Sequence, residues 1–333
     1  MRYRTLGRTG LQVSEIGFGC GPTAGLMVRG EPDARKEAVA RALELGINYF
    51  DTAPIYGDTV SERHLAETLR ELGANPIVVT KVALGTEDLG DIQASVVRSV
   101  ESSLERLGRD SLELVQLHNR VAAERAPKAD IGVGALLTVE DVLGPGGVLE
   151  GLETLRRQGR VRCFGCCAFG GEVAAVNQLI DSGRFDTILV QYSILNPSAW
   201  TDTGQPGPRS FGEVGVRAAG RGMGVIVLRA LEAGALAAAE QAHPLSGGAE
   251  RPGPEYQAKL QRAQALRFLT DSGQQTMAQA ALRFVLSTLA VSTVLVGFSD
   301  VSQVEEAAAA SDMGALPDDM LFRIEELRGG GNL

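Results

Sequence analysis

The chain has 333 residues, of which 44% are hydrophobic and 22% are charged. This composition is near the average for globular proteins and supplies a large apolar core, so extensive disorder is not expected. The formal net charge is −9, and Lys and Arg are scattered along the sequence, which argues against nucleic acid or an anionic membrane as a partner. The length fits two average domains or one barrel with loop insertions.

The amino terminus and the cysteines indicate the compartment. No apolar stretch follows the first positive charges, so no secretory signal is expected, and no segment approaches a membrane span. Three of the four cysteines lie together at Cys163, Cys166 and Cys167, in an apolar segment. Without a second cysteine cluster or paired histidines, they indicate buried thiols in a reducing compartment and not a zinc site. We therefore expect a cytoplasmic protein with no metal.

The first predicted element is a small β-hairpin over residues 1–13, which turns at residues 8–10. One unit then recurs: a short apolar run rich in β-branched residues, a turn, and a longer amphipathic helix. In chain order, the predicted strands are Glu15–Gly19, Asn48–Asp51, Ile77–Val82, Leu112–His118, Val161–Cys167, Thr187–Gln191, Gly224–Leu228 and Thr293–Gly297. The clearest helical spacing lies in Asp33–Leu45, Ser61–Leu72, Ile92–Leu107, Gly151–Gln158 and Met277–Leu289.

Eight such units after a hairpin predict an α/β protein, a single (β/α)8 TIM barrel that forms one domain over residues 1–333. The structural alternative is a doubly wound nucleotide-binding fold. Its glycine motif is absent after the predicted strands: the nearest match, Gly17-Phe-Gly-Cys-Gly21, has Pro22 where the third glycine belongs.

Three insertions follow predicted strands, at Arg120 to Gly147, Asn196 to Gly215 and Ala237 to Tyr256. In a barrel, the loops after the strands form the catalytic face, so these long loops should line the substrate and cofactor pockets. The glycine-rich end of the chain, residues 327–333, is expected to be a mobile tail.

Four polar residues lie at or just after successive strand ends. Asp51 ends the second strand, Tyr56 lies five positions later, and Lys81 and His118 lie at the ends of the third and fourth strands. A tyrosine hydroxyl has a pKa of about 10, so donating its proton near neutral pH needs a close cation such as Lys81 to stabilise the anion. Asp51 would hold that ammonium, and His118 would orient and polarise a carbonyl oxygen.

Each of these residues also has a structural explanation. Asp51 resembles a helix or turn cap, Lys81 a solvated strand end, and His118 a satisfied polar core residue. Their common position at the ends of neighbouring strands favours a catalytic set.

Several segments resemble the aldo-keto reductases. Gly46 to Gly57, which reads GINYFDTAPIYG, and the following Ser61-Glu62 are similar to that family's principal signature. Leu6–Leu11, Val79–Lys81 and Leu114–His118 are similar to its amino-terminal hairpin, lysine strand and histidine strand, and the similarity extends from about residue 3 to about residue 310. The resemblance implies a nicotinamide dinucleotide bound in extended form, and reversible reduction of an aldehyde or ketone with Tyr56 as general acid.

The resemblance also implies a set of cofactor contacts: Gly19, Cys20, Asp51, Cys167, Gln191, Leu228, Arg229, Leu231, Ser299, Gln303 and Glu306. Two of these positions depart from the family pattern. Cys167-Ala168 replaces a Ser-Asn pair that holds the carboxamide, and Leu228 replaces an aromatic ring that stacks on the nicotinamide. Gln191 retains the other amide contact, and Arg229 could reach a pyrophosphate. Leu228 and Cys167 could equally be core residues.

The choice of nucleotide depends on residues 296–306. Family members that prefer NADP carry Lys or Arg there, whereas this chain has none and has Asp300 and Gln303 instead. Helix N-terminal amides could still bind a phosphate. We therefore expect NADPH, with NADH as an alternative.

The predicted function is NAD(P)H-dependent reduction of a small aldehyde or ketone, or the reverse oxidation of an alcohol. The alternative is a slow nucleotide-binding sensor or regulatory subunit of the same fold, which the departures at Ala168 and Leu228 favour. Substrate choice should lie in the three long loops and in residues such as Phe18, Asn119 and Trp200.

Overall fold

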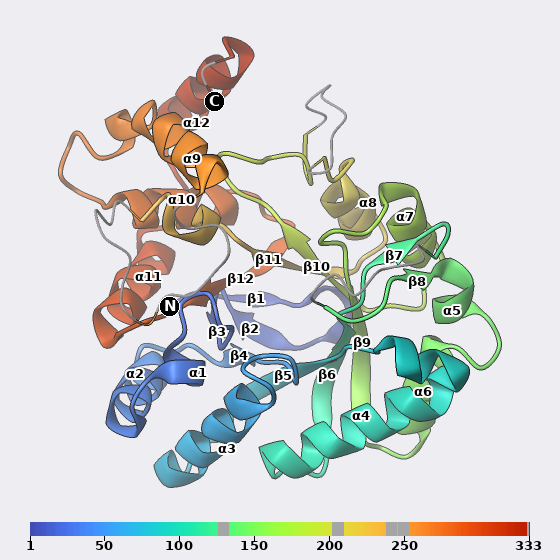
Figure 1. The fold of residues 1–333 in the computed structure, drawn as a ribbon. Coiled ribbons are helices and arrows are strands. Elements are labelled where there is room, and N and C mark those ends of the chain that lie inside the picture. The colour runs from blue at the N-terminus through green and yellow to red at the C-terminus, as the bar shows by residue number, and fades with distance from the viewer. Residues whose placement is uncertain (126–132, 202–209, 238–244, 246–252, 332) are drawn as a thin grey trace.

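The computed structural model describes residues 1–125, 133–201, 210–237, 245, 253–331 and 333. Its centre is a closed barrel of parallel strands with helices around it (Figure 1). The barrel strands, in the order in which they pair around the ring, are β3 (Ile16–Gly19), β4 (Tyr49–Asp51), β5 (Ile77–Val82), β6 (Leu112–Leu117), β9 (Val161–Cys167), β10 (Thr187–Gln191), β11 (Gly224–Leu228) and β12 (Val291–Gly297). The predicted barrel and all eight of its strands are confirmed, with shifts of one or two residues at some ends.

Two apolar layers follow from the alternation of side chains along each strand. One set of positions, including Tyr49, Val79, Leu114 and Ile226, fills the barrel interior. The alternate positions, such as Phe50 and Val115, pack outward against the helices. Every strand is therefore buried on both faces, as parallel sheets require.

The predicted amino-terminal hairpin is confirmed and closes one end of the barrel. Its strands β1 (Tyr3–Thr5) and β2 (Gln12–Ser14) pair antiparallel, and a short helical turn, η1 (Gly7–Thr9), joins them. Leu6 and Val13 enter the interior cluster. Gly7 has a φ of +47°, and a Cβ there would lie 2.1 Å from the Gly224 nitrogen, so only glycine permits this approach to the start of β11.

The helices are α1 (Leu26–Arg29), α2 (Pro32–Glu44), α3 (Val60–Leu72), α4 (Ile92–Leu107), α5 (Val139–Leu143), α6 (Val148–Arg157), α7 (Val173–Asp181), α8 (Val214–Gly220), α9 (Pro254–Gln264), α10 (Met277–Leu286), α11 (Val301–Met313) and α12 (Asp318–Gly329). The helix predicted to end at Leu289 ends three residues earlier. Arg4 of the hairpin donates to the carbonyl oxygens of Leu286, Thr288 and Val291 at 2.7, 3.1 and 2.7 Å, and so satisfies carbonyl groups at and beyond the helix end.

The predicted insertions are partly described. The first contains a two-stranded parallel sheet of β7 (Val121–Ala122) and β8 (Leu137–Thr138), followed by α5; its residues 126–132 lie outside the described residues. Residues 202–209, 238–244 and 246–252 of the other two insertions also lie outside them. Among the described helices, none is long and apolar enough to span a membrane.

The predicted mobile tail overlaps a helix. Residues 327–329 form the last turn of α12, and the Arg328 guanidinium donates to the Ile194 carbonyl oxygen at 3.0 Å. The expected tail therefore starts at least three residues too early, because the helix continues through Gly329, the first glycine of the terminal run.

Candidate active site

The alternation of side chains brings one set of polar residues to the carboxyl end of the barrel interior. Tyr49 and Val79 fill the interior, so Asp51 and Lys81, two residues further along β4 and β5, lie on the same side at the mouth. With the same spacing of two, Gln116 follows Leu114 on β6, and His118 lies just after the end of that strand. The four residues predicted to be catalytic therefore converge as expected.

Lys81 and Asp51 form a buried ion pair. The Lys81 Nζ lies 2.5 Å from Asp51 Oδ1 and donates to the Thr52 carbonyl oxygen at 2.9 Å, and the Gln116 amide donates to Asp51 Oδ2 at 3.2 Å. Both charged residues are almost fully buried. Burial alone would lower the pKa of Lys81, but the Asp51 carboxylate and Tyr56 raise it above its ordinary value. The ammonium therefore stays charged throughout the neutral range.

Tyr56 lies beside this ammonium in the loop after β4. Lys81 Nζ is 4.9 Å from the centroid of the Tyr56 ring, and a Cβ at Gly21 would lie 3.7 Å from that ring. Burial raises the pKa of Tyr56 to about 12, while Lys81 acts to lower it. The cation lowers the pKa of Tyr56, as expected, but desolvation outweighs this effect.

The backbone just after Tyr56 is strained. Gly57, Asp58 and Thr59 have φ values of 63°, 51° and 70°, and left-handed backbone is costly for the two non-glycine residues. Ser61, at the start of α3, holds the loop in place through hydrogen bonds of 2.9 Å with the Thr52 hydroxyl and the Cys20 carbonyl oxygen. The conformation persists because these contacts over-determine it.

The signature residue Glu62 has a structural role. It is fully buried, accepts a hydrogen bond of 2.6 Å from the Thr80 hydroxyl, and pairs with the Arg106 guanidinium at 2.5 Å. These contacts join α3 to β5 and α4. They fix the base of the loop that carries Tyr56.

His118 completes the set. Its ring lies 5.9 Å from the Tyr56 ring, centroid to centroid, in an edge-on arrangement. Its backbone nitrogen donates to the Val82 carbonyl oxygen at 2.8 Å, whereas its buried Nδ1 has no hydrogen-bond partner among the described residues. Burial and the charge of Lys81 hold the pKa of His118 well below its ordinary value. A neutral imidazole is thus available to a ligand.

The residues predicted to face a nicotinamide lie at the ends of three adjacent strands. Cys167 ends β9 and is buried, as is Ala168 after it; burial, against the lowering effect of Lys81, raises the pKa of the Cys167 thiol to about 12. Gln191 and Leu228 pair in register at the ends of β10 and β11. Leu228 packs against the interior cluster, so this part of the site presents mainly apolar surface and one amide.

A buried carboxylate that the sequence analysis missed orients the side-chain amide of Gln191. Glu232, in the short helical turn η3 (Glu232–Gly234), accepts from the Ser193 hydroxyl at 2.5 Å and from Gln191 Nε2 at 3.4 Å, and pairs with Lys259 Nζ of α9 at 3.0 Å. An ionised carboxylate only accepts, so it fixes the amide with its nitrogen toward Glu232 and its oxygen turned away. That oxygen suits the NH₂ group of a carboxamide.

The other predicted cofactor contacts lie on two sides of the barrel mouth. Gly19 pairs in register with Asp51, and the Cys20 nitrogen donates to the Asp51 carbonyl oxygen at 2.9 Å. Arg229 has a φ of +60°, and its guanidinium carbon lies 5.1 Å from the centroid of the Phe169 ring. Leu231 is partly buried against the outer core.

The amino terminus of α11 is already capped by an acid. Asp300 Oδ1 accepts from the Gln303 nitrogen at 3.1 Å, and the Gln303 side chain donates to Asp300 Oδ2 at 3.3 Å and accepts from the Ser299 nitrogen at 2.9 Å. Glu306 lies further along the helix, where its carbonyl oxygen accepts from Gln279 at 3.3 Å. The helix end expected to meet a nucleotide phosphate therefore carries a carboxylate.

Two expectations about substrate-contacting residues are wrong. Phe18 is fully buried on the outer face of β3 and stacks on Phe50 at 5.1 Å, because Gly17 and Gly19 take the inward positions. Asn119 is buried, and its amide bonds the backbone of Leu84 and Ala135.

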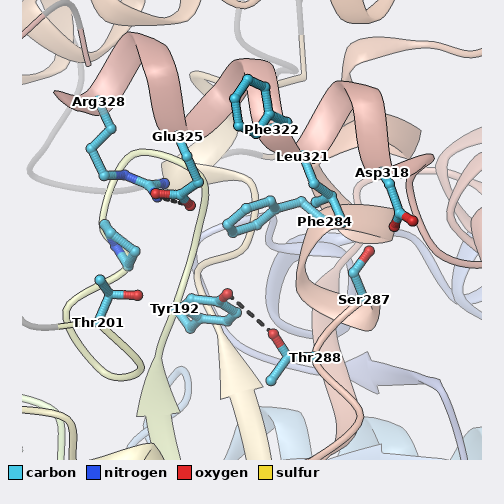
Figure 2. A pocket seen from close by; sticks show the side chains of 11 residues that line it. Tyr192, Thr201, Phe284, Ser287, Thr288, Asp318, Leu321, Phe322, Glu325 and Arg328 are labelled. Atoms are coloured by element: carbon cyan, nitrogen blue, oxygen red, sulfur yellow. Dashed lines mark hydrogen bonds and ion pairs between the residues drawn. The ribbon is translucent and has the colours of Figure 1, made fainter. Parts of the chain in front are cut away.

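Trp200 packs instead against Tyr192, with 4.8 Å between ring centroids. Beside it, a cavity of about 400 Å³ lies between α10, α12 and the segment after β10, outside the barrel (Figure 2). The hydroxyls of Tyr192 and Thr288, two of the residues that line it, form a hydrogen bond of 3.1 Å (Figure 2). None of the residues predicted to bind cofactor or to act in catalysis lines this cavity.

Comparisons with known proteins agree with this architecture. The model of the Aldo/keto reductase family matches residues 15–328. The chain is 31% identical to L-galactose dehydrogenase from Arabidopsis thaliana, an alignment that covers 93% of this chain and 88% of the relative, and 26% identical to pyridoxal 4-dehydrogenase from Microbacterium luteolum, with 91% of each covered.

Among solved structures, an aldo-keto reductase from Bacillus halodurans in its holo form superposes with a TM-score of 0.71 at 24% identity, over 98% of this chain and 96% of that one. This likeness supports the fold. Because the family match extends over nearly the whole chain and a relative exceeds 30% identity along most of it, the chain belongs to the Aldo/keto reductase family of oxidoreductases.

Proposed function

We propose that the chain interconverts an aldehyde or ketone and the corresponding alcohol with a nicotinamide dinucleotide, and that Tyr56 donates the proton in reduction. One observation carries this proposal: Lys81, ion-paired with Asp51, lies beside the Tyr56 ring, and the His118 ring lies edge-on to Tyr56 at the mouth of the barrel. A proton donor, a cation and a hydrogen-bonding imidazole are what a carbonyl oxygen needs as it gains negative charge.

Each residue has a separate task in this scheme. His118 orients and polarises the carbonyl oxygen through a ring N–H. Tyr56, which is protonated near neutral pH, donates its proton to that oxygen. Lys81 stabilises the phenolate that remains, and Asp51 keeps the ammonium in place.

The cofactor would lie across the same mouth. A bound reduced nicotinamide supplies the hydride that reaches the carbonyl carbon. Gln191, with its amide fixed by Glu232, would accept from the carboxamide, and Leu228 would pack against the ring. The buried His118 Nδ1, which has no hydrogen-bond partner in the part of the chain that the structure describes, is consistent with a site built for a ligand. We propose NADPH or NADH, and the acid cap at Asp300 favours the dinucleotide without a 2′-phosphate.

The names of two relatives favour testing the oxidative direction as well. One is an L-galactose dehydrogenase and the other a pyridoxal 4-dehydrogenase, so their names point to a sugar and an aldehyde. We propose a small carbonyl compound or alcohol as substrate. The four described cysteines are free and buried, which supports a reducing, cytoplasmic location.

The experiment is to mix purified protein with NADPH or NADH and a panel of aldehydes, quinones and sugar-derived ketones, and with NADP or NAD and the matching alcohols, while following nicotinamide absorbance. Turnover of at least one carbonyl–alcohol pair, lost in Tyr56→Phe, supports the proposal. Tight nucleotide binding without turnover across the panel would favour the alternative, a slow nucleotide-binding regulatory subunit, for which Ala168 and Leu228 are the motivating observations.

A further inference from the structure

Three loops bring two arginines to one aromatic ring. Phe169 follows β9, Arg120 follows β6, and Arg229 follows β11. The guanidinium carbons of Arg120 and Arg229 lie 5.8 and 5.1 Å from the centroid of the Phe169 ring. In the barrel, β9 and β10 separate β6 from β11, so both side chains reach the same sector of the mouth from opposite sides. We call Arg120 and Arg229 the arginine pair.

A partly buried guanidinium needs a partner anion, and Arg120 lacks one among the described residues. Among the described residues, no carboxylate forms an ion pair with it, and its buried Nε has no hydrogen-bond partner. Partial burial also lowers the pKa of Arg120, as expected for a guanidinium that loses water without gaining a counter-charge. A second guanidinium on the same ring adds repulsion. In a chain with a net charge of −9, the Arg120 guanidinium, which has no counter-charge among the described residues at the candidate site, needs an explanation.

The backbone is shaped to hold this arrangement. Gly170 has a φ of +77°, and a Cβ there would lie 2.6 Å from Arg120 Nε, so the glycine makes room for the side chain. The Arg120 carbonyl oxygen accepts from the Leu137 nitrogen at 3.0 Å, which fixes the residue to β8. Arg229 has a strained φ of +60°. A costly backbone conformation, such as that of Arg229, is typical of residues that bind a ligand.

We propose that the arginine pair binds a carboxylate or phosphate group carried by the substrate, so that the preferred substrate is an oxo acid or a phosphorylated carbonyl compound. Guanidinium groups recognise such oxyanions through paired, charge-assisted hydrogen bonds. Arg120 lies two residues after His118, which the proposed function places against the carbonyl oxygen. The inference rests on that function in assigning the anion to the substrate. The other source of the same chemistry is the pyrophosphate of the dinucleotide.

A pair of matched substrates tests the proposal. Succinic semialdehyde and butanal have the same chain length and differ in the carboxylate. The parent should prefer the acid by at least about tenfold in kcat/KM, and Arg120→Gln should remove most of that preference while leaving butanal kinetics unchanged. Arg63→Gln, at an exposed position on α3, is the control and should change neither the preference for the acid nor the butanal kinetics. A parent without preference for the acid, or an Arg120→Gln variant that retains it, would overturn the proposal.

An equilibrium measurement separates this inference from the proposed function. Succinate and NADPH are titrated into the parent, Arg120→Gln and Arg229→Gln, after thermal melts confirm that each variant is folded. Loss of succinate binding with unchanged NADPH affinity in Arg120→Gln supports the substrate anion site, even if no aldehyde is turned over and the proposed function fails. Weaker NADPH binding in both variants with succinate binding unchanged would instead assign the pair to the cofactor phosphates and contradict the proposal.

Discussion

At Tyr56, burial and a neighbouring cation shift the pKa of the hydroxyl in opposite directions. Burial disfavours the phenolate and raises the pKa to about 12, while Lys81 favours it. The consequence depends on the direction of the reaction. Reduction needs a protonated tyrosine, which is present throughout the neutral range, whereas oxidation needs the phenolate and should accelerate as the pH rises.

We therefore predict that replacing Lys81 with Met changes the pH dependence of the reaction rate in a specific way. Without the cation, the pKa of Tyr56 rises further, so the rising limb of kcat for alcohol oxidation should move to higher pH, and both directions should be nearly inactive near pH 7. The measurement is a pH–rate profile of parent and variant.

Lys36→Met is the control for this experiment, because Lys36 pairs with Glu71 on the exposed surface. Circular dichroism checks that Lys81→Met is folded, since Asp51 is left buried and unpaired. If the rising limb of the pH–rate profile does not shift in a folded Lys81→Met variant, Lys81 does not act on Tyr56 electrostatically.

Individual site residues differed in how well the sequence predicted them. That Asp51, Tyr56, Lys81 and His118 lie together could be predicted, because they lie at or just after the ends of parallel strands that meet at one rim of a barrel. Gln116 was not singled out, although it has the same spacing from His118 that marks the inward face. Its role becomes evident only from the hydrogen bond to Asp51.

Among the elements, the turn after β11 depends on α9 for its shape. Arg229, Glu232 and Ala233 all have positive φ, and the buried Glu232 joins the turn to Lys259 of α9. Removing one partner of a buried ion pair commonly costs about 3 kcal/mol or more. We expect Lys259→Met to lower the free energy of unfolding by an amount of that order and to weaken nucleotide binding through Gln191.

Chemical denaturation of three proteins tests this coupling: Lys259→Met, Glu232→Gln and the double variant. The double variant should be less destabilised than the sum of the single variants, because no unpaired charge remains buried. Lys36→Met breaks a half-exposed ion pair and should lower the free energy of unfolding by less than about 1 kcal/mol. If the double variant loses as much unfolding free energy as the two single variants together, Glu232 and Lys259 act independently.

The start of α11 should set the choice of nucleotide. Asp300 and Gln303 bond one another there, so a 2′-phosphate would meet a carboxylate and no cation on this turn. We predict a weak parental preference between NADPH and NADH, and a shift of about tenfold toward NADPH in Gln303→Arg.

Binding titrations at low and moderate salt measure this preference, because a charge-assisted contact weakens as salt increases. Gln178→Arg, the same substitution at an exposed position on α7, is the control. A strong parental preference for NADPH that Gln303→Arg leaves unchanged would place recognition of the phosphate elsewhere, with Arg229 the first candidate.

The elements themselves were predicted to different degrees. Strands buried on both faces leave long apolar runs, so all eight were found. The turn after β11 was not, because its strained backbone is fixed by Ser193 and Lys259, which lie far away in sequence. At the early end of α10, the Leu286 carbonyl oxygen likewise accepts from Arg4, more than 280 residues away.

For the whole molecule, alternating side chains and a repeated βα unit determine the barrel, and the hairpin closes the end opposite the candidate site. That the chain forms one domain over residues 1–333 stays a prediction, and a single cooperative unfolding transition would support it. The substrate could not be predicted, because it depends on side chains from separate loops, such as the arginine pair, that only the fold brings together.

The most direct test of the central claim is the turnover of Tyr56→Phe on one verified carbonyl substrate, measured beside its nucleotide affinity. The substitution removes only the hydroxyl, and general acid catalysis contributes about 10²- to 10⁴-fold. We predict that kcat for reduction falls by that factor while the fold and the nucleotide dissociation constant stay nearly unchanged. Turnover comparable to the parent, in a variant that binds nucleotide normally, would contradict the assignment of Tyr56 as the proton donor.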